Sequence, residues 1–199
     1  MAYKKSYSDS KPKFKIVINS PVVLAFAAIC VLALVLDKVT NRSSTALLFS
    51  VYRQGASMTS PFTYIRFFGH VFGHLNLEHL ASNLMMILIL GPMLEERYGG
   101  KVIAAVIAVT ALITGVSSFI LFPNQALMGA SGVVFAFILL SSFTSFKERE
   151  IPLTFILVAV LYLGQQIYQG IFIKDNVSQF THILGGITGS ILGYRLNKK

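Results

Sequence analysis

The sequence has little charge, one cysteine and no tryptophan. Charged residues make up 13% of its 199 residues, hydrophobic residues make up 54%, and mean hydropathy is +0.68. A soluble globular domain carries about 25% charged residues, so this composition excludes an ordinary soluble protein. The single cysteine, Cys30, excludes a disulfide within the chain and is expected to be a small buried residue. What remains is the composition of a membrane protein.

Long apolar runs recur along the chain, near the length needed to cross roughly 30 Å of hydrocarbon. They predict an all-α polytopic membrane protein whose six transmembrane helices form one domain over residues 16–199. The first run could instead be a signal peptide, but it ends in Asp37-Lys38 with no small-residue cleavage site, so a retained helix is favoured. The expected spans are residues 21–36, 77–94, 102–122, 128–146, 151–169 and 180–194.

The distribution of basic residues predicts an orientation. The chain carries 17 Lys and Arg against 8 Asp and Glu, a net charge of +9. The positive-inside rule places both termini in the cytoplasm, which leaves outside only Lys38, Arg42, Arg53, Arg66 and Lys174. Residues 1–15 are expected to be a disordered basic tail near anionic headgroups. The charge therefore predicts the lipid bilayer, and no nucleic acid, as a partner.

One long connection, residues 37–76, lies between the first two expected spans on the outer side. It is rich in aromatic residues interleaved with Arg53 and Arg66, a pattern typical of a loop packed at the membrane interface. A long ordered loop is often functional. Its aromatic residues are Phe49, Tyr52, Phe62, Tyr64, Phe67, Phe68 and Phe72.

Four polar side chains, His79, Asn83, Ser131 and His182, stand at membrane depth, where such groups are costly. His79 precedes Glu95 by 16 positions, and Ser131 precedes Lys147 by 16, which is roughly 24 Å each at 1.5 Å per helical residue. His182 precedes Arg195 by 13 positions, or roughly 20 Å. Three separate segments thus predict polar groups at similar heights, several Å below the outer surface.

Each of these residues also has a structural interpretation. A lone serine in a transmembrane helix usually bonds its own i−4 carbonyl, and a lone His or Asn is usually an interhelical hydrogen bond. Their shared depth favours catalysis, because a serine hydroxyl needs a base such as a neutral imidazole. An amide and the free N–H groups at a helix start can then hold an oxyanion. Apart from Glu78 no carboxylate lies at that depth, which favours a Ser131–His182 dyad over a triad.

These motifs, taken in order, resemble the rhomboid intramembrane serine proteases. Gly129-Ala130-Ser131-Gly132 looks like that family's GxSG, and His182 with the glycines after it looks like its base on the sixth helix. The pair His79 and Asn83 is similar to its HxxxN. Two further matches are the histidine-rich run 70–79 and the ExR element Glu95-Glu96-Arg97, with Gly99 after it.

The chain departs from that family's pattern at two places. The first outer loop of the family often carries Trp-Arg, whereas this chain has Ile65-Arg66. The sequence leaves the partner of Arg66 open between Glu95 and polar backbone groups. The position four after the serine is often a tyrosine in the family and is Phe135 here, which keeps a ring face for His182 but has no hydroxyl.

The resemblance implies a six-helix rhomboid-like bundle in a bacterial plasma membrane. It implies catalysis by Ser131 and His182 without a cofactor, and an oxyanion bound by His79, Asn83 and Ser131 itself. Gly129, Gly132 and Phe135 would serve substrate access and close packing. The substrates would be transmembrane segments of single-span membrane proteins, cut from the outer side within a water-filled cavity.

Three other functions compete with this one. One is a zinc enzyme whose metal is held by His70, His74 and His79, but no HExxH motif accompanies them. An inactive rhomboid-like binding factor would lack the serine or the histidine, and this chain keeps both. A transporter is disfavoured because the spans contain no corresponding pair of Gly/Pro-broken helices.

Overall fold

The structure, a computed structural model, describes residues 16–143 and 176–197 together with scattered positions between 153 and 168. Within these residues there is no strand, only one isolated antiparallel bridge between Val51 and Leu127. The all-α class is confirmed. The expected tail 1–15 and most of the expected span 151–169 lie outside the described residues. The helices are α1 (Pro21–Val39), α2 (Pro61–Gly69), α3 (Leu77–Tyr98), α4 (Gly100–Leu121), α5 (Ser131–Ser142) and α7 (Asn176–Leu196), with short turns η1 (Thr45–Phe49) and η2 (His70–Phe72).

Three helices of the described part, α1, α3 and α4, are long and apolar enough to cross a membrane. They correspond to the first three expected spans. The fourth expected span was to begin at residue 128, which is wrong: α5 begins at Ser131. Gly129 has a φ of +128°, incompatible with a helix, and Leu127 is paired with Val51. Residues 144–146 of that span lie outside the described residues, and the count of six spans stays a prediction.

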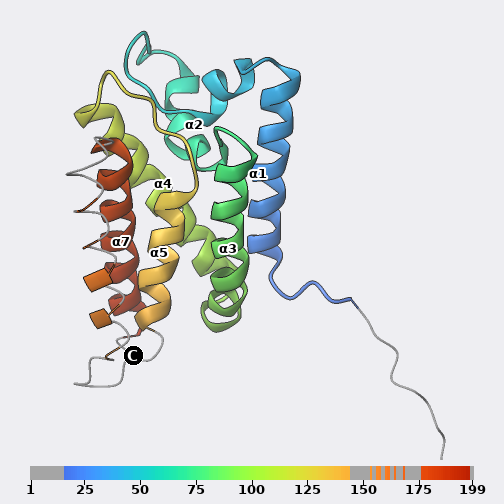
Figure 1. Cartoon of the computed structure of the whole chain (residues 1–199), viewed down its shortest axis with the longest axis vertical. Helices are drawn as coiled ribbons and strands as arrows, with labels where there is room; N and C mark the ends of the chain where they lie inside the picture. Colours follow the sequence, from blue (N-terminus) through green and yellow to red (C-terminus); the bar gives the residue numbers. More distant parts are fainter. Residues whose placement is uncertain are drawn as a thin grey trace, which may run out of the picture.

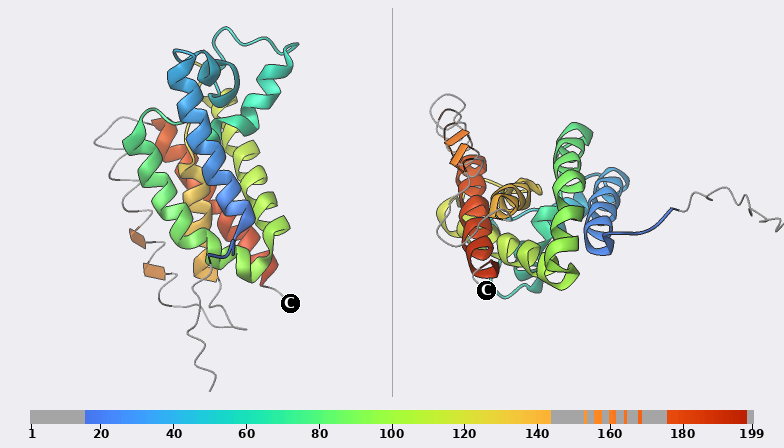
Figure 2. Two further views of the ribbon diagram at one scale, coloured as in Figure 1. Left: turned by 90° about the vertical axis from the view of Figure 1, so that its right-hand side faces the viewer. Right: turned by 90° about the horizontal axis from the view of Figure 1, so that it is seen from below.

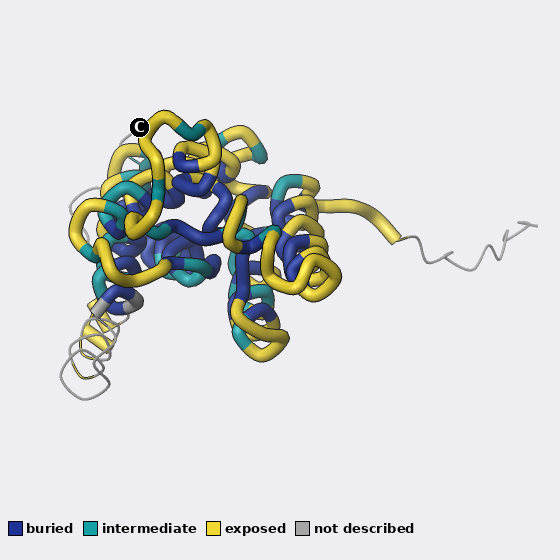
Figure 3. The backbone as a smooth tube through the Cα atoms, turned by 90° about the horizontal axis from the view of Figure 1, so that it is seen from above, coloured by how far each residue is buried: buried dark blue, intermediate teal, exposed yellow. Residues whose placement is uncertain are grey.

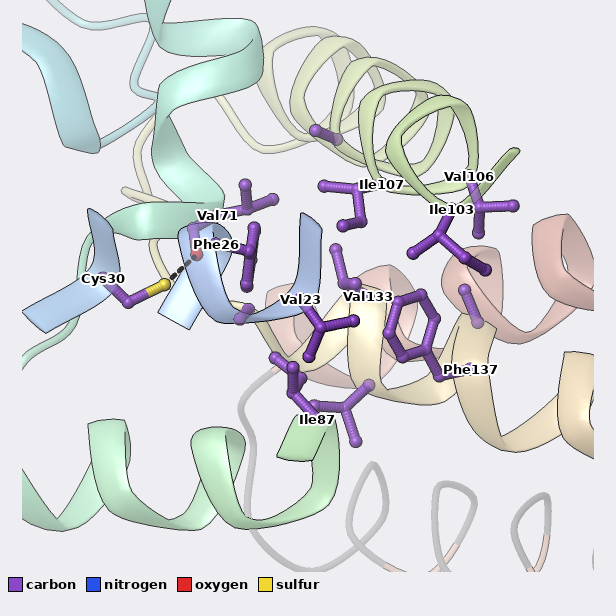
Figure 4. Packing of buried hydrophobic residues seen from close by; sticks show 14 of the residues in the cluster. Val23, Phe26, Cys30, Val71, Ile87, Ile103, Val106, Ile107, Val133 and Phe137 are labelled. Carbon is purple, nitrogen blue, oxygen red and sulfur yellow. Dashed lines mark hydrogen bonds between the residues drawn. The ribbon is translucent and has the colours of Figure 1, made fainter. Parts of the chain in front are cut away.

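The long helices run side by side, and α4 lies among the others (Figure 1). α4 contacts α1, α2, α3, α5 and α7. Half of the residues in its membrane-length apolar stretch are buried. Burial follows the faces that look inward, while the outer faces are exposed (Figure 3). The core between α1, α3, α4 and α5 is apolar, as Val23, Ile87, Ile103, Val133 and Phe137 illustrate (Figure 4).

A carboxylate from α3 caps the start of α1. Pro21 occupies the first turn of α1, and Ser20 before it makes no side-chain cap. The two oxygens of the buried Glu95 carboxylate accept the backbone N–H groups of Val22 at 3.0 Å and Val23 at 2.9 Å. These N–H groups have no partner within their own helix. The ExR element therefore ties the end of α3 to the beginning of α1.

Small residues bring α5 and α7 into backbone contact. A side chain at Gly185 would lie 3.0 Å from Cα of Gly132, and one at Gly189 would lie 2.7 Å from Cα of Ala136. Close approach of this kind is how helices associate in membranes, where apolar burial gives no advantage over lipid. The two helices lie side by side in each view of Figures 1 and 2.

The segment between α1 and α3 is ordered and packs over one end of the bundle (Figure 1). Gly69 and Gly73 abut the backbone of Leu48 and Phe49, so η1, α2 and η2 form one compact unit. Arg66 resolves the question left by the sequence: its guanidinium donates to the Tyr52 hydroxyl at 2.8 Å and to Thr63 Oγ1 at 3.0 Å. Both acceptors are side-chain hydroxyl groups, so among the described residues neither Glu95, which caps α1, nor a backbone group is the partner of Arg66.

Candidate active site

The strand-like segment before Ser131 is held by the α1–α3 connection. Val51 and Leu127 exchange two backbone hydrogen bonds, of 2.9 and 2.8 Å, and the N–H of Gly129 donates to the carbonyl oxygen of His70 at 2.9 Å. The histidine-rich run thus fixes the backbone two residues before Ser131. The sequence placed this run near the site but did not indicate a main-chain contact.

Ser131 is the first residue of α5 and is partly exposed. Ala130 precedes it as the N-cap and offers no side-chain cap. The first N–H groups of a helix lack intrahelical partners and lie at the positive end of its dipole. The expectation that Ser131 lies at a helix start is confirmed, and an uncapped start leaves these donors for a ligand.

His79 and Asn83, one turn apart on α3, lie against Gly129. A Cβ atom at Gly129 would be 2.9 Å from His79 Nε2 and 4.0 Å from Asn83 Nδ2, so only glycine fits. Asn83 is buried, and within the part of the chain that the structure describes neither its Nδ2 nor His79 Nδ1 has a hydrogen-bond partner. Asn76 caps α3 by accepting the N–H of His79 at 2.8 Å, which sets where this polar face begins.

α7 brings His182 to the first turns of α5. The His182 ring contacts the Phe135 ring, with centroids 4.5 Å apart and planes inclined at 45°. A Cβ at Gly132 would lie 3.6 Å from the carbonyl oxygen of Thr181. Residues adjoining Ser131 therefore meet residues adjoining His182, and the expected ring contact of Phe135 is confirmed. Gly132 allows the close approach of α7, whereas Gly129 leaves room for the side chains of α3.

His70 and His74 contact the residues of the candidate site: the His70 carbonyl accepts the N–H of Gly129, and the His74 ring contacts the His79 ring. His70 is fully buried, with Nε2 3.1 Å from the carbonyl oxygen of Ala111, so that nitrogen carries the proton. His74 Nδ1 lies 3.1 Å from the carbonyl oxygen of Phe72, and the His74 ring packs edge-on against His79 with centroids 5.1 Å apart. Burial lowers the pKa of His70 to about 4. Burial, and then the neighbouring His79, lower the pKa of His74 to about 4. Both imidazoles are therefore neutral at pH 7.

A metal centre has no support in the part of the chain that the structure describes. No group of three His, Cys, Asp or Glu side chains there could hold a metal ion. His70 directs Nε2 at a carbonyl on α4, and His74 directs Nδ1 at its own loop. The three imidazoles of the zinc alternative thus face different partners.

Comparison with known proteins gives a consistent result. The family model described as "Rhomboid domain" matches residues 61–199. Rhomboid-related protein 2 of Mus musculus is 30% identical over 158 residues, which cover 69% of this chain and 52% of that protein. Rhomboid-related protein 1 of Caenorhabditis elegans is 30% identical over 138 residues, covering 65% and 39%. Rhomboid-like protease 2 of Toxoplasma gondii is 42% identical over 69 residues, covering 34% and 24%. The chain spans about half or less of the length of these relatives.

Proposed function

The chain belongs to the rhomboid family of membrane proteins, and from this we propose that it is an intramembrane serine protease. Ser131 would be the nucleophile and His182 the base. The observation that carries the proposal is the amide nitrogen of Asn83, which has no hydrogen-bond partner among the described residues and is buried beside Gly129, just before the uncapped start of the helix that bears Ser131. A buried donor without a partner is costly unless a ligand uses it.

The reaction follows from the groups at this site. His182 accepts the Ser131 hydroxyl proton as Oγ adds to the carbonyl carbon of the substrate peptide bond. The resulting tetrahedral intermediate expels the amine, which takes the proton from His182, and leaves an acyl ester on Ser131. A water molecule that gives its proton to His182 then attacks the ester. The second tetrahedral intermediate then expels Ser131 Oγ, which takes that proton back from His182, so the products are a carboxylic acid and the free serine.

The charge that develops on the carbonyl oxygen needs donors already in place. Asn83 Nδ2 and the free N–H groups of the first turn of α5 supply them, and His79 adds a ring nitrogen beside Gly129. These donors need no reorientation if their positions are fixed by packing. Gly129, pinned to His70, and Asn83, buried on α3, meet that condition.

The substrate would be a transmembrane segment that can leave its helical form. A helix hides its carbonyl groups in i→i−4 hydrogen bonds, so attack requires an extended stretch. Gly, Pro and other weak helix formers near the cut lower the cost of unwinding. Water or polar groups of the enzyme would satisfy the freed backbone.

The test uses purified protein in detergent with a generic single-span substrate and, in parallel, a fluorophosphonate probe that labels activated serines. Ser131→Ala and His182→Ala should each remove cleavage and labelling. The double variant should be little worse than either single one, because the two residues act as a unit. Melting temperatures should stay close to that of the wild type.

Ser142→Ala is the matched control. Ser142 lies on the same helix and donates to the carbonyl oxygen of Ile138, away from the site. It should keep both cleavage and labelling. Cleavage that persists in Ser131→Ala would rule out this mechanism, and a wild type that binds substrate but is neither active nor labelled would point to a binding factor instead.

A further inference from the structure

An apolar groove runs between α1 and α4 beneath the α2–η2 turn, separate from the candidate active site. It has a volume of about 440 Å³ and is open to the outside of the bundle. Phe26, Val71 and Ile107 form its floor, where Figure 4 shows them packed together. No polar side chain lines it. Its volume is in the range of small-molecule sites, roughly 300–1,000 Å³.

The sequence creates this groove by a row of small side chains. Ala104, Ala108 and Ala111 are spaced four and three apart, so they share the face of α4 that lines the groove. Ala25 does the same on α1. Larger residues at these positions would let the two helices close on each other through side chains, whereas alanine leaves a channel.

The position of the groove limits what can fill it. Both of its walls belong to membrane-length helices, so its surroundings are hydrocarbon. Water is not stable in it, since a buried water needs two to four polar partners. An empty channel would forfeit dispersion contacts along its lining. The groove extends along α1 from Pro21 to Ile29, roughly 12 Å at 1.5 Å per residue, which is close to the depth of one leaflet, about 15 Å of the roughly 30 Å core.

A basic side chain stands one helical turn before the first α4 residue of this groove, near the start of α1. Lys101 is exposed on the first turn of α4, three positions before Ala104. It lies at the border between this groove, which Ala104 lines, and a smaller groove between α4 and α7, which Lys101 itself lines. The neighbouring Gly100 packs closely against α1, since a Cβ atom added to it would lie 3.0 Å from Val22 Cγ2. The nearby carboxylate of Glu95 is bound to the N–H groups of α1, which leaves the Lys101 ammonium available to an external anion.

We propose that this groove binds one acyl chain of an anionic phospholipid, with the headgroup phosphate at Lys101. The chain would complete the packing between α1 and α4. Its far end would meet Phe68 and Phe72, which belong to the unit that holds His70 and through it Gly129. Lipid binding would thus stabilise the α1–α3 connection. The proposal is independent of proteolysis.

Native mass spectrometry of the purified full-length chain tests it, with dioleoyl phosphatidylglycerol and dioleoyl phosphatidylcholine as the probes. We expect one phosphatidylglycerol adduct per protein, about fivefold more abundant than the phosphatidylcholine adduct, since one Lys near an anionic headgroup contributes that much. Lys101→Gln should abolish this preference. Ala104→Leu with Ala108→Leu should fill the groove and lower the phosphatidylglycerol adduct by about tenfold, the effect of losing two buried methylenes.

Ala105→Leu is the matched control for the filled groove. Ala105 is the neighbour of Ala104 but, together with Lys101, lines a smaller groove between α4 and α7. It should keep the adduct. An adduct that survives in Ala104→Leu/Ala108→Leu, or that is lost in Ala105→Leu, would overturn the assignment.

A second measurement holds even if the filled variant does not fold. The chain has no tryptophan, so Phe68→Trp places a single fluorophore at the far end of the groove. Phosphatidylglycerol with brominated acyl chains should quench its fluorescence and saturate at one lipid per protein. Quenching that rises without saturation, as from bulk lipid, would also overturn the proposal.

Discussion

α7 meets α5 through glycines, whereas α3 meets the start of α5 through polar side chains. Along α7, Gly185 and Gly189 bring the backbones of the two helices together at Gly132 and Ala136. Along α3, His79 and Asn83 face Gly129, and each has a buried nitrogen that finds no hydrogen-bond partner among the described residues. The α5–α7 contact leaves no room for an added atom, whereas the α3 side chains keep hydrogen-bonding groups that a ligand could use.

The two contacts have different roles at the candidate site: one positions His182, and the other presents hydrogen-bond donors. The α7 contact fixes the height of His182 relative to α5 by geometry that tolerates no added atom. The α3 contact presents donors whose partners are absent from the described chain, which stabilises nothing until a ligand arrives. Variants on the α7 side should therefore affect stability first, and variants on the α3 side should affect activity first.

Asn83→Ala should have the largest effect, which should be on catalytic activity and not on stability. Loss of one of the proposed oxyanion donors should lower kcat by roughly ten- to a thousandfold. The melting temperature should stay almost unchanged, because Asn83 Nδ2 makes no hydrogen bond within the described residues. Asn76→Ala on the same helix is the contrast, since it removes the α3 cap and should lower stability by about 1 kcal/mol. If Asn83→Ala instead weakened substrate binding with normal turnover, Asn83 would be a binding residue.

Acid should destabilise the protein through His70. Its pKa is about 4 in the folded state and near the ordinary 6.5 when unfolded, so the unfolded chain takes up a proton first. The stability that neutral His70 confers is complete above about pH 6.5 and falls by at most about 1.4 kcal/mol per pH unit until about pH 4. His70→Gln keeps a donor for Ala111 without titrating. Thermal melts at pH 7 and pH 5 should show a smaller difference for this variant, and an equal difference would contradict this role.

Gly185→Ala should break the α7 contact. The added Cβ would lie 3.0 Å from Cα of Gly132 and closer still to its carbonyl oxygen, which should cost about 1–3 kcal/mol of stability as overpacking does elsewhere. Activity should fall only as the folded fraction falls. Ile187→Ala, on the exposed face of α7, is the control and should leave the melting temperature nearly unchanged. A Gly185→Ala protein of wild-type stability would mean that the helices can separate freely.

Phe135→Leu should have the smallest effect on kcat. Phe135 lies on α5 and contacts the His182 ring of α7. Losing the ring contact with His182 removes about 0.5–1.5 kcal/mol, so kcat should fall by about three- to tenfold. Phe135→Tyr keeps the ring and should stay near the wild-type rate. Equal kcat values for all three proteins would show that His182 does not depend on this ring for its orientation.

Much of the site was predictable because its residues have fixed spacings along single helices. His79 and Asn83 share a face at i, i+4, and Phe135 stands one turn beyond Ser131, so each pair follows from helical geometry alone. The apolar runs likewise placed α1, α3 and α4 close to their observed limits. The start of α5 was misplaced by three residues because Gly129 reads as part of an apolar run, while its positive φ depends on the contacts at Val51 and His70.

The sequence by itself determined an all-helical membrane chain with Ser131 at a helix start, since length, hydropathy and period are local properties. The similar heights of the polar residues stay a prediction. Only the tertiary structure decided which surfaces those residues meet. It directs Glu95 to the start of α1 rather than to Arg66, and it assigns Gly132 to α7 and Gly129 to α3. Pairings between segments far apart in the chain depend on the mutual fit of whole helices, which no single stretch of sequence contains.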